Sequence, residues 1–327
     1  MKLKTFAKTA GAVLMGGVVA TAMTSTAQAE FPEKPVKIMV GFSAGGGTDT
    51  TARGFASYVH EAEVMNGMPA VIINKPGGSG MVAAKIVKDG EPDGYTLYMI
   101  NSGSFAAAVM SAKGDAPVDP RKDFTNLGCI SQLVTALTVH SSSQFKSAAD
   151  WVKHYKDSGE TLRWSTSGPA TMHALLGHLF LDTTGIKHQV IPFQGGSKAR
   201  GALVAQKVDA SFNGVHLTAG FENEIRVLGV PTAKRDPVNP DVPTFGEQGL
   251  PALNIAGPMC LWGPNGMPAE TVAKLEAAVK HVSGVKGFGT FMSKSKLAAF
   301  HMTSEEGTTA TNALFDTLQP VIDKIIN

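Results

Sequence analysis

The sequence predicts an α/β protein with two lobes, and three observations support this fold class. Apolar, β-branched runs alternate with stretches whose apolar residues recur every three or four positions, which is typical of helices alternating with strands in mainly parallel sheets. The chain has 327 residues, enough for two hydrophobic cores. No low-complexity linker divides it, so we expect ordered strands, rather than a flexible tether, to join the lobes.

Residues 1–29 have the pattern of a signal peptide that is removed. Lysines precede the apolar stretch GAVLMGGVVATAM, which is too short to span a bilayer, and Ala27-Gln28-Ala29 matches an A-x-A cleavage site. No second long apolar run follows. We therefore expect a soluble, exported mature chain of 298 residues that begins at Glu30.

The charge balance argues against a nucleic-acid-binding protein. Residues 1–29 contain three of the 29 basic residues and none of the 27 acidic ones, so the mature chain carries 26 basic and 27 acidic residues. A nucleic-acid partner would require a concentrated basic face. No C-x-x-C or clustered histidine pattern indicates a metal. An oxidising compartment permits a bridge between Cys129 and Cys260, but we expect each to be a small buried apolar residue.

The predicted elements follow one another along the chain in the α/β order. Strands are predicted at 36–40, 70–73, 95–100, 135–140, 162–165, 188–192, 210–213 and 226–230. Ala52, Phe55, Ala56 and Val59 fall on one face of a helix after the first strand. Further helices are predicted at 148–156, 170–183, 198–206, 269–282 and 305–325, the last one with the capping-box pair Thr303 and Glu306.

The stretch VGFSAGGGTD, residues 40–49, joins the first strand to the first helix. A P-loop would need a lysine where Gly47 stands, and the dinucleotide fingerprint G-x-G-x-x-G is absent. Gly41 to Gly45 do match G-x-S-x-G, the serine-hydrolase elbow. Ser43, however, follows the first strand of the mature chain, whereas an elbow needs several strands before it. A secreted serine hydrolase using Ser43 stays as the alternative function.

Capture of a small anion is the interpretation that uses only what this loop contains. Consecutive glycines allow backbone N–H groups to approach a ligand, and the following helix adds its unpaired N-terminal N–H groups and positive dipole end. A tight turn that binds nothing is the alternative for a single loop. Small, hydroxyl-rich loops recur, however, at 101–104, 165–173 and 193–199. All follow predicted parallel strands, at whose carboxyl ends α/β sheets bind ligands, so we expect them to converge on one cleft.

Five segments carry a resemblance to a known family: FPEKPVKIMVGFSAGGGTD, VIINKPGGSG, PDGYTL, DPRKDF and DVPTFGEQGLP. In this order they are similar to segments of the periplasmic substrate-binding proteins of tripartite tricarboxylate transporters, the Bug or TctC family. The resemblance covers essentially the whole mature chain. It implies a two-lobed clamshell of the Venus-flytrap type, with residues 30–133 plus 255–327 in one lobe and 134–254 in the other.

The function implied by the resemblance is capture of a small organic carboxylate in the periplasm and its delivery to membrane subunits. A dicarboxylate is favoured and an aromatic carboxylate is the next choice. The resemblance implies a monomer without catalytic activity, cofactor or metal. The implied ligand-binding residues are Phe42, Ser43, Ala44, Gly45, Gly46, Gly47, Thr48, Asp49, Ser102, Ser104, Ser165, Ser167, Thr171, His173, Gln194, Gly195, Gly196, Ser197 and Asn213.

Some positions depart from the family pattern or have two interpretations. Ser43 and Ala44 replace two prolines, which predicts a more polar pocket. Asn213 replaces an aspartate, so it either favours a more highly charged ligand or only keeps a hydrogen bond. Trp164 is expected in the core. Arg200 is expected on a solvated face, although its guanidinium would suit a carboxylate. His173 either bonds a backbone partner or contacts the ligand.

Overall fold

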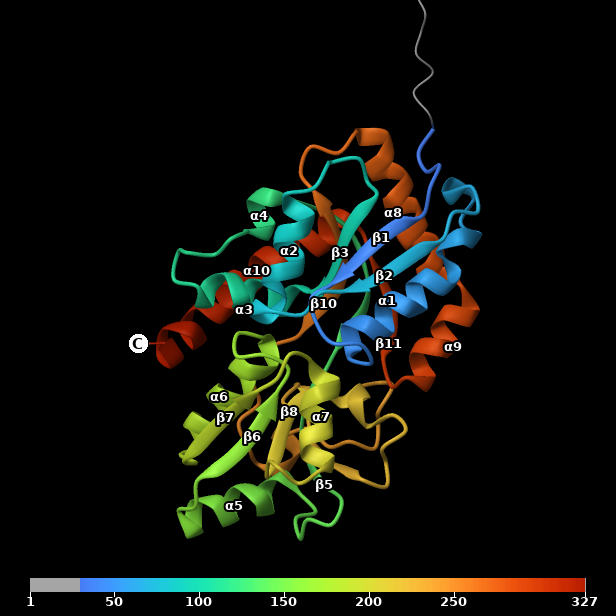
Figure 1. Ribbon diagram of the computed structural model, residues 1–327. Coiled ribbons are helices and arrows are strands. Elements are labelled where there is room, and N and C mark those ends of the chain that lie inside the picture. The colour runs from blue at the N-terminus through green and yellow to red at the C-terminus, as the bar shows by residue number, and fades with distance from the viewer. Residues whose placement is uncertain (1–29, 327) are drawn as a thin grey trace, which may run out of the picture. The chain divides into compact units, whose positions relative to one another are not determined.

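The computed structural model describes residues 30–326, and a six-stranded sheet forms the larger of two lobes in this part of the chain (Figure 1). Its strands, in the order β11-β4-β10-β3-β1-β2, are β1 (Val36–Val40), β2 (Ala70–Asn74), β3 (Thr96–Asn101), β4 (Phe124–Leu133), β10 (Gly257–Pro264) and β11 (Ala298–Met302). The helices of this larger lobe are α1 (Gly47–Tyr58), α2 (Met81–Lys88), α3 (Ser102–Ser111), α4 (Pro120–Asp123), α8 (Ala269–Gly284), α9 (Lys286–Lys294) and α10 (Ser304–Ile326).

A five-stranded sheet forms the smaller lobe, in the order β7-β6-β8-β5-β9. Its strands are β5 (Thr135–His140), β6 (Leu162–Thr166), β7 (His188–Pro192), β8 (Ala210–Gly214) and β9 (Ile225–Gly229), and its helices are α5 (Ala148–Ser158), α6 (Met172–Thr184) and α7 (Gly196–Val204). Short 3-10 turns are η1 (Val59–Glu61), η2 (Glu63–Met65), η3 (Gly78–Gly80), η4 (Val215–Thr218) and η5 (Gly246–Gln248). The prediction of an α/β fold with two helix-flanked sheets is confirmed.

Both sheets are mixed rather than mainly parallel, which corrects the prediction. In the larger sheet β1 pairs in parallel with β2 and β3, whereas β10 and β4 run antiparallel to their neighbours. In the smaller sheet β6 pairs in parallel with β7 and β8, whereas β5 runs antiparallel to β8 and β9. The parallel strands are the ones followed by the glycine- and hydroxyl-rich loops. Their carboxyl ends therefore meet at the expected edges.

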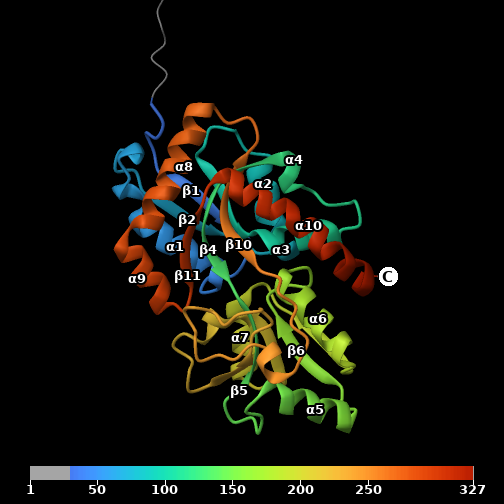
Figure 2. The ribbon, with the colours of Figure 1, turned by 180° about the vertical axis from the view of Figure 1, so that it is seen from behind.

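Strands β4, β10 and β11 were missed because their sequences do not have the usual strand pattern. β4 contains Gly128 at a positive φ and buried polar residues such as Asn126, and β10 begins with Gly-Pro and ends with Gly-Pro. Such residues normally indicate turns. β4 leads directly into β5 of the other lobe, and the chain returns to the larger lobe before β10 (Figure 2). The predicted connection through ordered strands is thus present from β4 to β5, whereas the return path, residues 230–256, has little regular structure.

Cys129 and Cys260 form a disulfide, so the expectation of two unpaired buried cysteines is wrong. The two residues face each other across neighbouring antiparallel strands β4 and β10. Sequence alone could not show this, because both strands were unrecognised and the cysteines are 131 residues apart. The bridge links the strand that leaves the larger lobe to the strand that returns to it.

Two helix features predicted from the sequence, a buried face and a capping box, are present in the structure. Ala52, Phe55 and Val59 are buried on one face of the α1 region, as their spacing predicts. At the start of α10, the Glu306 N–H donates to Thr303 Oγ1 at 3.2 Å, and the Thr303 N–H donates to Glu306 Oε2 at 2.8 Å. This is the predicted capping box.

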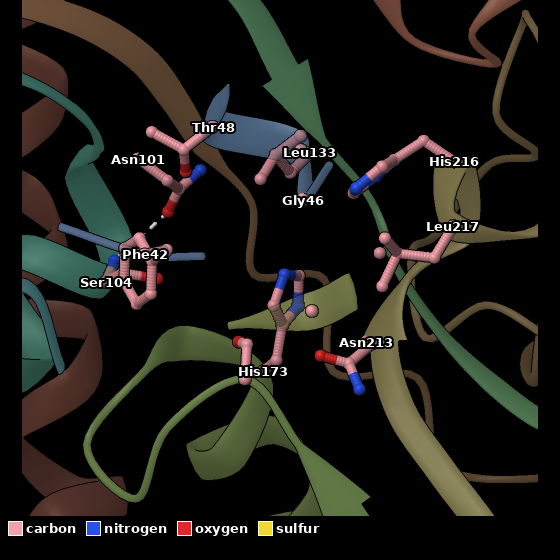
Figure 3. A pocket seen from close by; sticks show the side chains of 14 residues that line it. Phe42, Gly46, Thr48, Asn101, Ser104, Leu133, His173, Asn213, His216 and Leu217 are labelled. Atoms are coloured by element: carbon pink, nitrogen blue, oxygen red, sulfur yellow. Dashed lines mark hydrogen bonds between the residues drawn. The ribbon is translucent and has the colours of Figure 1, made fainter. Parts of the chain in front are cut away.

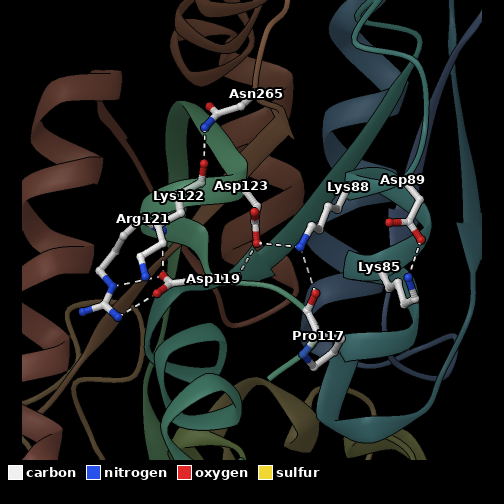
Figure 4. Close-up of polar contacts among 9 residues, drawn as sticks. All are labelled: Lys85, Lys88, Asp89, Pro117, Asp119, Arg121, Lys122, Asp123 and Asn265. Carbon is white, nitrogen blue, oxygen red and sulfur yellow. Dashed lines mark hydrogen bonds and ion pairs between the residues drawn. The ribbon is translucent and has the colours of Figure 1, made fainter. Parts of the chain in front are cut away.

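The segment DPRKDF, residues 119–124, has a structural role on the larger lobe (Figure 4). Asp119 caps the short helix α4, where Pro120 occupies the first turn, and Arg121 folds back onto the Asp119 carboxylate at 2.7 Å. Asp123 pairs with Lys88 of α2 at 3.2 Å. These contacts join α4 to α2, which explains this family-like segment without a ligand.

The predicted signal peptide lies outside the described residues. Within residues 30–326, no helix combines the length and the apolar character that crossing a bilayer requires.

Candidate functional site

A cavity lies between the two lobes, at the carboxyl ends of the parallel strands (Figure 3). Its volume is about 380 Å³, including the part that is open to solvent. Loops of both lobes line it, so neither lobe forms the site alone. The lining residues are Phe42, Gly46, Gly47, Thr48, Asn101, Ser104, Leu133, Ser167, His173, Gly196, Asn213, Gly214, His216 and Leu217.

Four helices begin at this cavity, two from each lobe. The lining includes the starts of α1, α3 and α7 and the first turn of α6. The N-caps of α1 and α7 are Gly46 and Gly195, and neither provides a side-chain cap. First-turn N–H groups of these two helices are therefore free to bind a ligand. Because each helix start carries a positive dipole end, the cavity favours an anion.

Residues of the glycine-rich loop have two different roles. Gly46, Gly47 and Thr48 line the cavity at the start of α1, as the loop interpretation predicts. Ser43, Ala44 and Gly45 do not line it. Asp49 is buried, but its carboxylate accepts hydrogen bonds from the Gly45 N–H at 2.8 Å and from the side chains of the neighbouring Arg53 and Asn74, both at 2.9 Å.

Asp49 thus holds the loop in shape and is turned away from the cavity. Burial raises the pKa of its carboxyl, but the hydrogen bonds from Arg53, Gly45 and Asn74 outweigh burial and lower the pKa below its ordinary value. The carboxylate is therefore ionised at neutral pH and already has its partners.

Loops of the two lobes contact each other directly beside the cavity. The Ser43 N–H and hydroxyl both donate to the Gln194 carbonyl, at 2.9 and 2.5 Å, and the Ser197 hydroxyl donates to the Ala44 carbonyl at 2.7 Å. Gly195 has a φ of +139°, and a Cβ there would lie 2.6 Å from Ser43 Oγ. Only glycine allows this approach. The lobes are in contact in this conformation.

Other predicted residues lie behind the cavity wall or beside it. The Ser102 hydroxyl bonds Thr311 and the Cys260 sulfur, and Ser165 bonds Ser211. Thr171 caps α6 by accepting from the Ala174 N–H at 3.2 Å. Gln194 lines a neighbouring hollow together with Ser167. The predicted residues that do line the cavity are Phe42, Gly46, Gly47, Thr48, Ser104, Ser167, His173, Gly196 and Asn213.

His173 and Asn213 each combine a protein partner with a group that faces the cavity (Figure 3). His173 Nδ1 lies 2.7 Å from Thr135 Oγ1, a side chain rather than the backbone partner considered from the sequence. Asn213 Nδ2 donates to Ser211 Oγ at 2.6 Å, whereas its Oδ1 has no hydrogen-bond partner among the described residues. Both side chains are buried. Each has a position from which it can contact a ligand.

His216 is the most important lining residue that sequence analysis missed. It lies on η4, directly after β8, and its ring points into the cavity (Figure 3). A single histidine in VHLTAG forms no motif, and its only signal is its place after the carboxyl end of a predicted strand. The other unpredicted lining residues are Asn101, Leu133, Gly214 and Leu217.

Trp164 and Arg200 do not line the cavity. Trp164 is fully buried among Phe180 and Phe212, which confirms its expected place in the core. Arg200 is not on a solvated face, because its guanidinium stacks on Phe221 and donates to the Leu217 carbonyl at 3.3 Å. It lines a smaller hollow directly behind Asn213 and Leu217. Its charge therefore lies close behind the cavity wall.

His173 and His216 are the only titratable side chains that line the cavity. Burial lowers the pKa of His173 to about 4. Burial, with the neighbouring His173 and Arg200, lowers the pKa of His216 to about 3. Both imidazoles are thus neutral at neutral pH in this conformation. Within the described chain, no group of three His, Cys, Asp or Glu side chains could hold a metal ion.

A family model described as "Tripartite tricarboxylate transporter family receptor" matches residues 57–325. The chain belongs to this family. By this description, its members are receptors of tripartite tricarboxylate transporters. A UPF0065 protein from the TAR-I ttuE-ttuC' intergenic region of Agrobacterium vitis is 31% identical over 269 residues, which cover 80% of this chain and 76% of the relative. The resemblance inferred from the five segments is therefore confirmed.

Solved structures of similar proteins show the same fold. Rpa4515 of R. palustris, solved with adipate, is 26% identical with a TM-score of 0.84, over 90% of this chain and 97% of that protein. MatC (Rpa3494) from Rhodopseudomonas palustris, solved with malate, is 26% identical with a TM-score of 0.82, over 89% and 100% of the two chains. Adipate and malate are both dicarboxylates.

Proposed function

We propose that this receptor captures a small organic dicarboxylate between its lobes in the periplasm and delivers it to the membrane subunits of a tripartite transporter. The observation that carries the proposal is the convergence of four helix starts on one cavity that no acidic side chain lines. Two helix starts come from each lobe, which suits a ligand with a carboxylate at each end. Acids of this class occupy two solved relatives.

The binding energy comes from main-chain N–H groups and helix ends rather than from a Lys or Arg side chain. A charge-assisted hydrogen bond contributes about 1.5 to 3 kcal/mol, and a helix end adds about 0.3 to 2 kcal/mol. Several such contacts together offset the desolvation of a small anion. Ser43 donates its hydroxyl to a main-chain carbonyl rather than to an imidazole, so nothing favours the hydrolase alternative.

Closure follows from where these contacts lie. We propose that residues 30–133 plus 255–327 and residues 134–254 move as two rigid lobes. A ligand that bonds both lobes gains its full set of contacts only when they meet, so it shifts the equilibrium toward the closed form. The direct contacts between Ser43 and Gln194 and between Ala44 and Ser197 belong to that closed form.

A thermal-shift screen of refolded, ligand-free protein tests the proposed function. Malate, adipate, succinate, citrate and benzoate are compared with amino acids and sugars. At about a hundred times its dissociation constant, a true ligand stabilises the protein by about 2.7 kcal/mol, which raises the melting temperature by several degrees. Stabilisation by amino acids or sugars and by no organic acid would contradict the proposal. Labelling of Ser43 by a fluorophosphonate would instead support the hydrolase.

A further inference from the structure

The His216 side chain is buried in the site without any partner. It is 6% exposed, and neither Nδ1 nor Nε2 has a hydrogen-bond partner within residues 30–326. Buried polar groups are normally hydrogen-bonded, and His216 lines the cavity, where a ligand can supply the partner that the protein does not. His173 differs, because Thr135 already occupies its Nδ1. His216 is therefore the imidazole with both nitrogens free to bind.

The ring of His216 lies against the start of α1, across the boundary between the lobes. A Cβ on Gly47 would lie 2.4 Å from Nε2, and a Cβ on Gly214 would lie 2.1 Å from Cε1. The ring thus fits between two glycines, one from each lobe. Nε2 therefore lies beside Gly47, the first residue of α1. An anion bound at that helix start is within reach of the imidazole.

The titratable groups near His216 either disfavour its protonation or are already paired. His173 of α6 and Arg200 of α7 both disfavour a charge on the ring. The neighbouring Asp49 on α1 is engaged by Arg53 and Asn74.

The remaining elements supply no free charge. On η4 itself, Thr218 accepts a hydrogen bond from Lys296, whose charge is paired with Glu222 at 2.8 Å. β4 contributes the apolar Leu133. A carboxylate ligand is the anion that this environment lacks.

We propose that His216 takes up one proton from solvent when a carboxylate ligand enters, and that the resulting imidazolium donates a hydrogen bond to the ligand. The inference rests on the proposed function. One N–H bond forms on the free ring nitrogen, the proton comes from water or buffer, and no other bond changes. The ligand supplies both the missing hydrogen-bond partner and the missing negative charge. Capture of the acid is thereby coupled to capture of a proton.

The pKa values also favour uptake of a proton by His216 when the ligand binds. In the ligand-free form, burial, His173 and Arg200 hold the pKa of His216 at about 3. A carboxylate within hydrogen-bond distance favours the charged ring and raises that pKa. Between the free and bound pKa values, affinity strengthens by up to tenfold for each unit that pH falls, because binding then takes up one proton.

Isothermal titration calorimetry in buffers of different ionisation enthalpy measures the protons taken up. The probe is malate, adipate or the acid with the largest thermal shift, titrated between about pH 5.5 and 7.5, where a carboxylic acid is mainly ionised. Wild type is expected to take up as much as one proton more than His216→Gln, which keeps a donor but does not titrate. His281→Gln, an exposed change on α8, is the matched control and keeps the wild-type uptake.

The possible outcomes separate the two proposals. Binding with equal proton uptake in wild type and His216→Gln overturns the role of His216 and leaves the proposed function standing. Absence of binding by every organic acid overturns the proposed function itself. A second measurement uses only wild type: ¹⁵N imidazole shifts should move His216 from neutral to charged when ligand is added. An imidazole that stays neutral in the saturated complex also overturns the inference.

Discussion

The glycine-rich loop 42–49 and the segment 213–217 face each other across the cavity and contribute different chemistry. The loop offers main-chain N–H groups and a helix end, and its one acidic side chain, Asp49, is turned away. The segment offers side chains, the amide oxygen of Asn213 and the imidazole of His216, which lack partners. Backbone groups recognise a carboxylate of any kind. Titratable side chains can add selectivity and a response to pH.

The largest expected effect comes from Gly47→Ala in the loop. The new Cβ would lie 2.4 Å from His216 Nε2 and 3.0 Å from Leu133, so the loop and the segment could not approach. Overpacking of this kind usually has an energetic effect of about 1 to 3 kcal/mol, and we expect affinity to fall by roughly a hundredfold, or about 2.8 kcal/mol. Calorimetric titration measures the change.

Gly201→Ala on α7 is the matched control, because no atom lies within 4 Å of its added Cβ. It should bind like wild type. Wild-type affinity in Gly47→Ala would show that the loop and the segment need not meet.

Acidification is expected to have an intermediate effect on the free energy of unfolding, because it acts on His216 of the segment and on the nearby His173, and not on the loop backbone. The pKa of His216 is lowered to about 3 and that of His173 to about 4, from about 6.5 in an unfolded chain. Between these values the unfolded chain binds more protons, so stability present above about pH 6.5 is lost as pH falls. Each histidine contributes up to about 1.4 kcal/mol per pH unit.

Urea unfolding of ligand-free protein at several pH values measures this slope. His216→Gln should show a smaller loss than wild type on acidification. Identical slopes would mean that His216 does not titrate with unfolding.

The smallest expected effect comes from Asn213→Asp, which adds a charge to the segment. The free Oδ1 faces the cavity, so the new carboxylate would repel a bound dicarboxylate. We expect affinity near neutral pH to fall about tenfold, or about 1.4 kcal/mol, and to recover partly in acid. Asn66→Asp, at an exposed turn, is the control. Tighter dicarboxylate binding by Asn213→Asp would contradict an anion-selective segment.

The same contrast explains what the sequence could predict. Loop 42–49 has a recognisable composition and follows a regular strand, so Gly46, Gly47 and Thr48 were found. Composition could not distinguish them from Ser43 to Gly45, because the division depends on which atoms Gln194 and Ser197 reach from the other lobe. His216 has no motif, and only the folded chain places it beside Gly47.

The fold shows a similar limit. The strands with alternating or β-branched sequences were predicted to within one residue at each end. β4 and β10 were missed because Gly128, Asn126 and Pro258 are unfavourable in strands. Their stability comes from neighbouring strands and from the Cys129–Cys260 bridge, which are long-range features. The mixed sheets could not be predicted without these strands.

The Cys129–Cys260 bridge also changes what a cut in the chain does. Residues 130–259 contain every strand of the smaller lobe, so the bridge closes that lobe into a single covalent ring attached to the rest of the chain at one point. A protease that nicks a surface turn of this ring leaves the two pieces linked. In an oxidising compartment the receptor thus survives one cleavage as one molecule, and only a reductant separates its fragments.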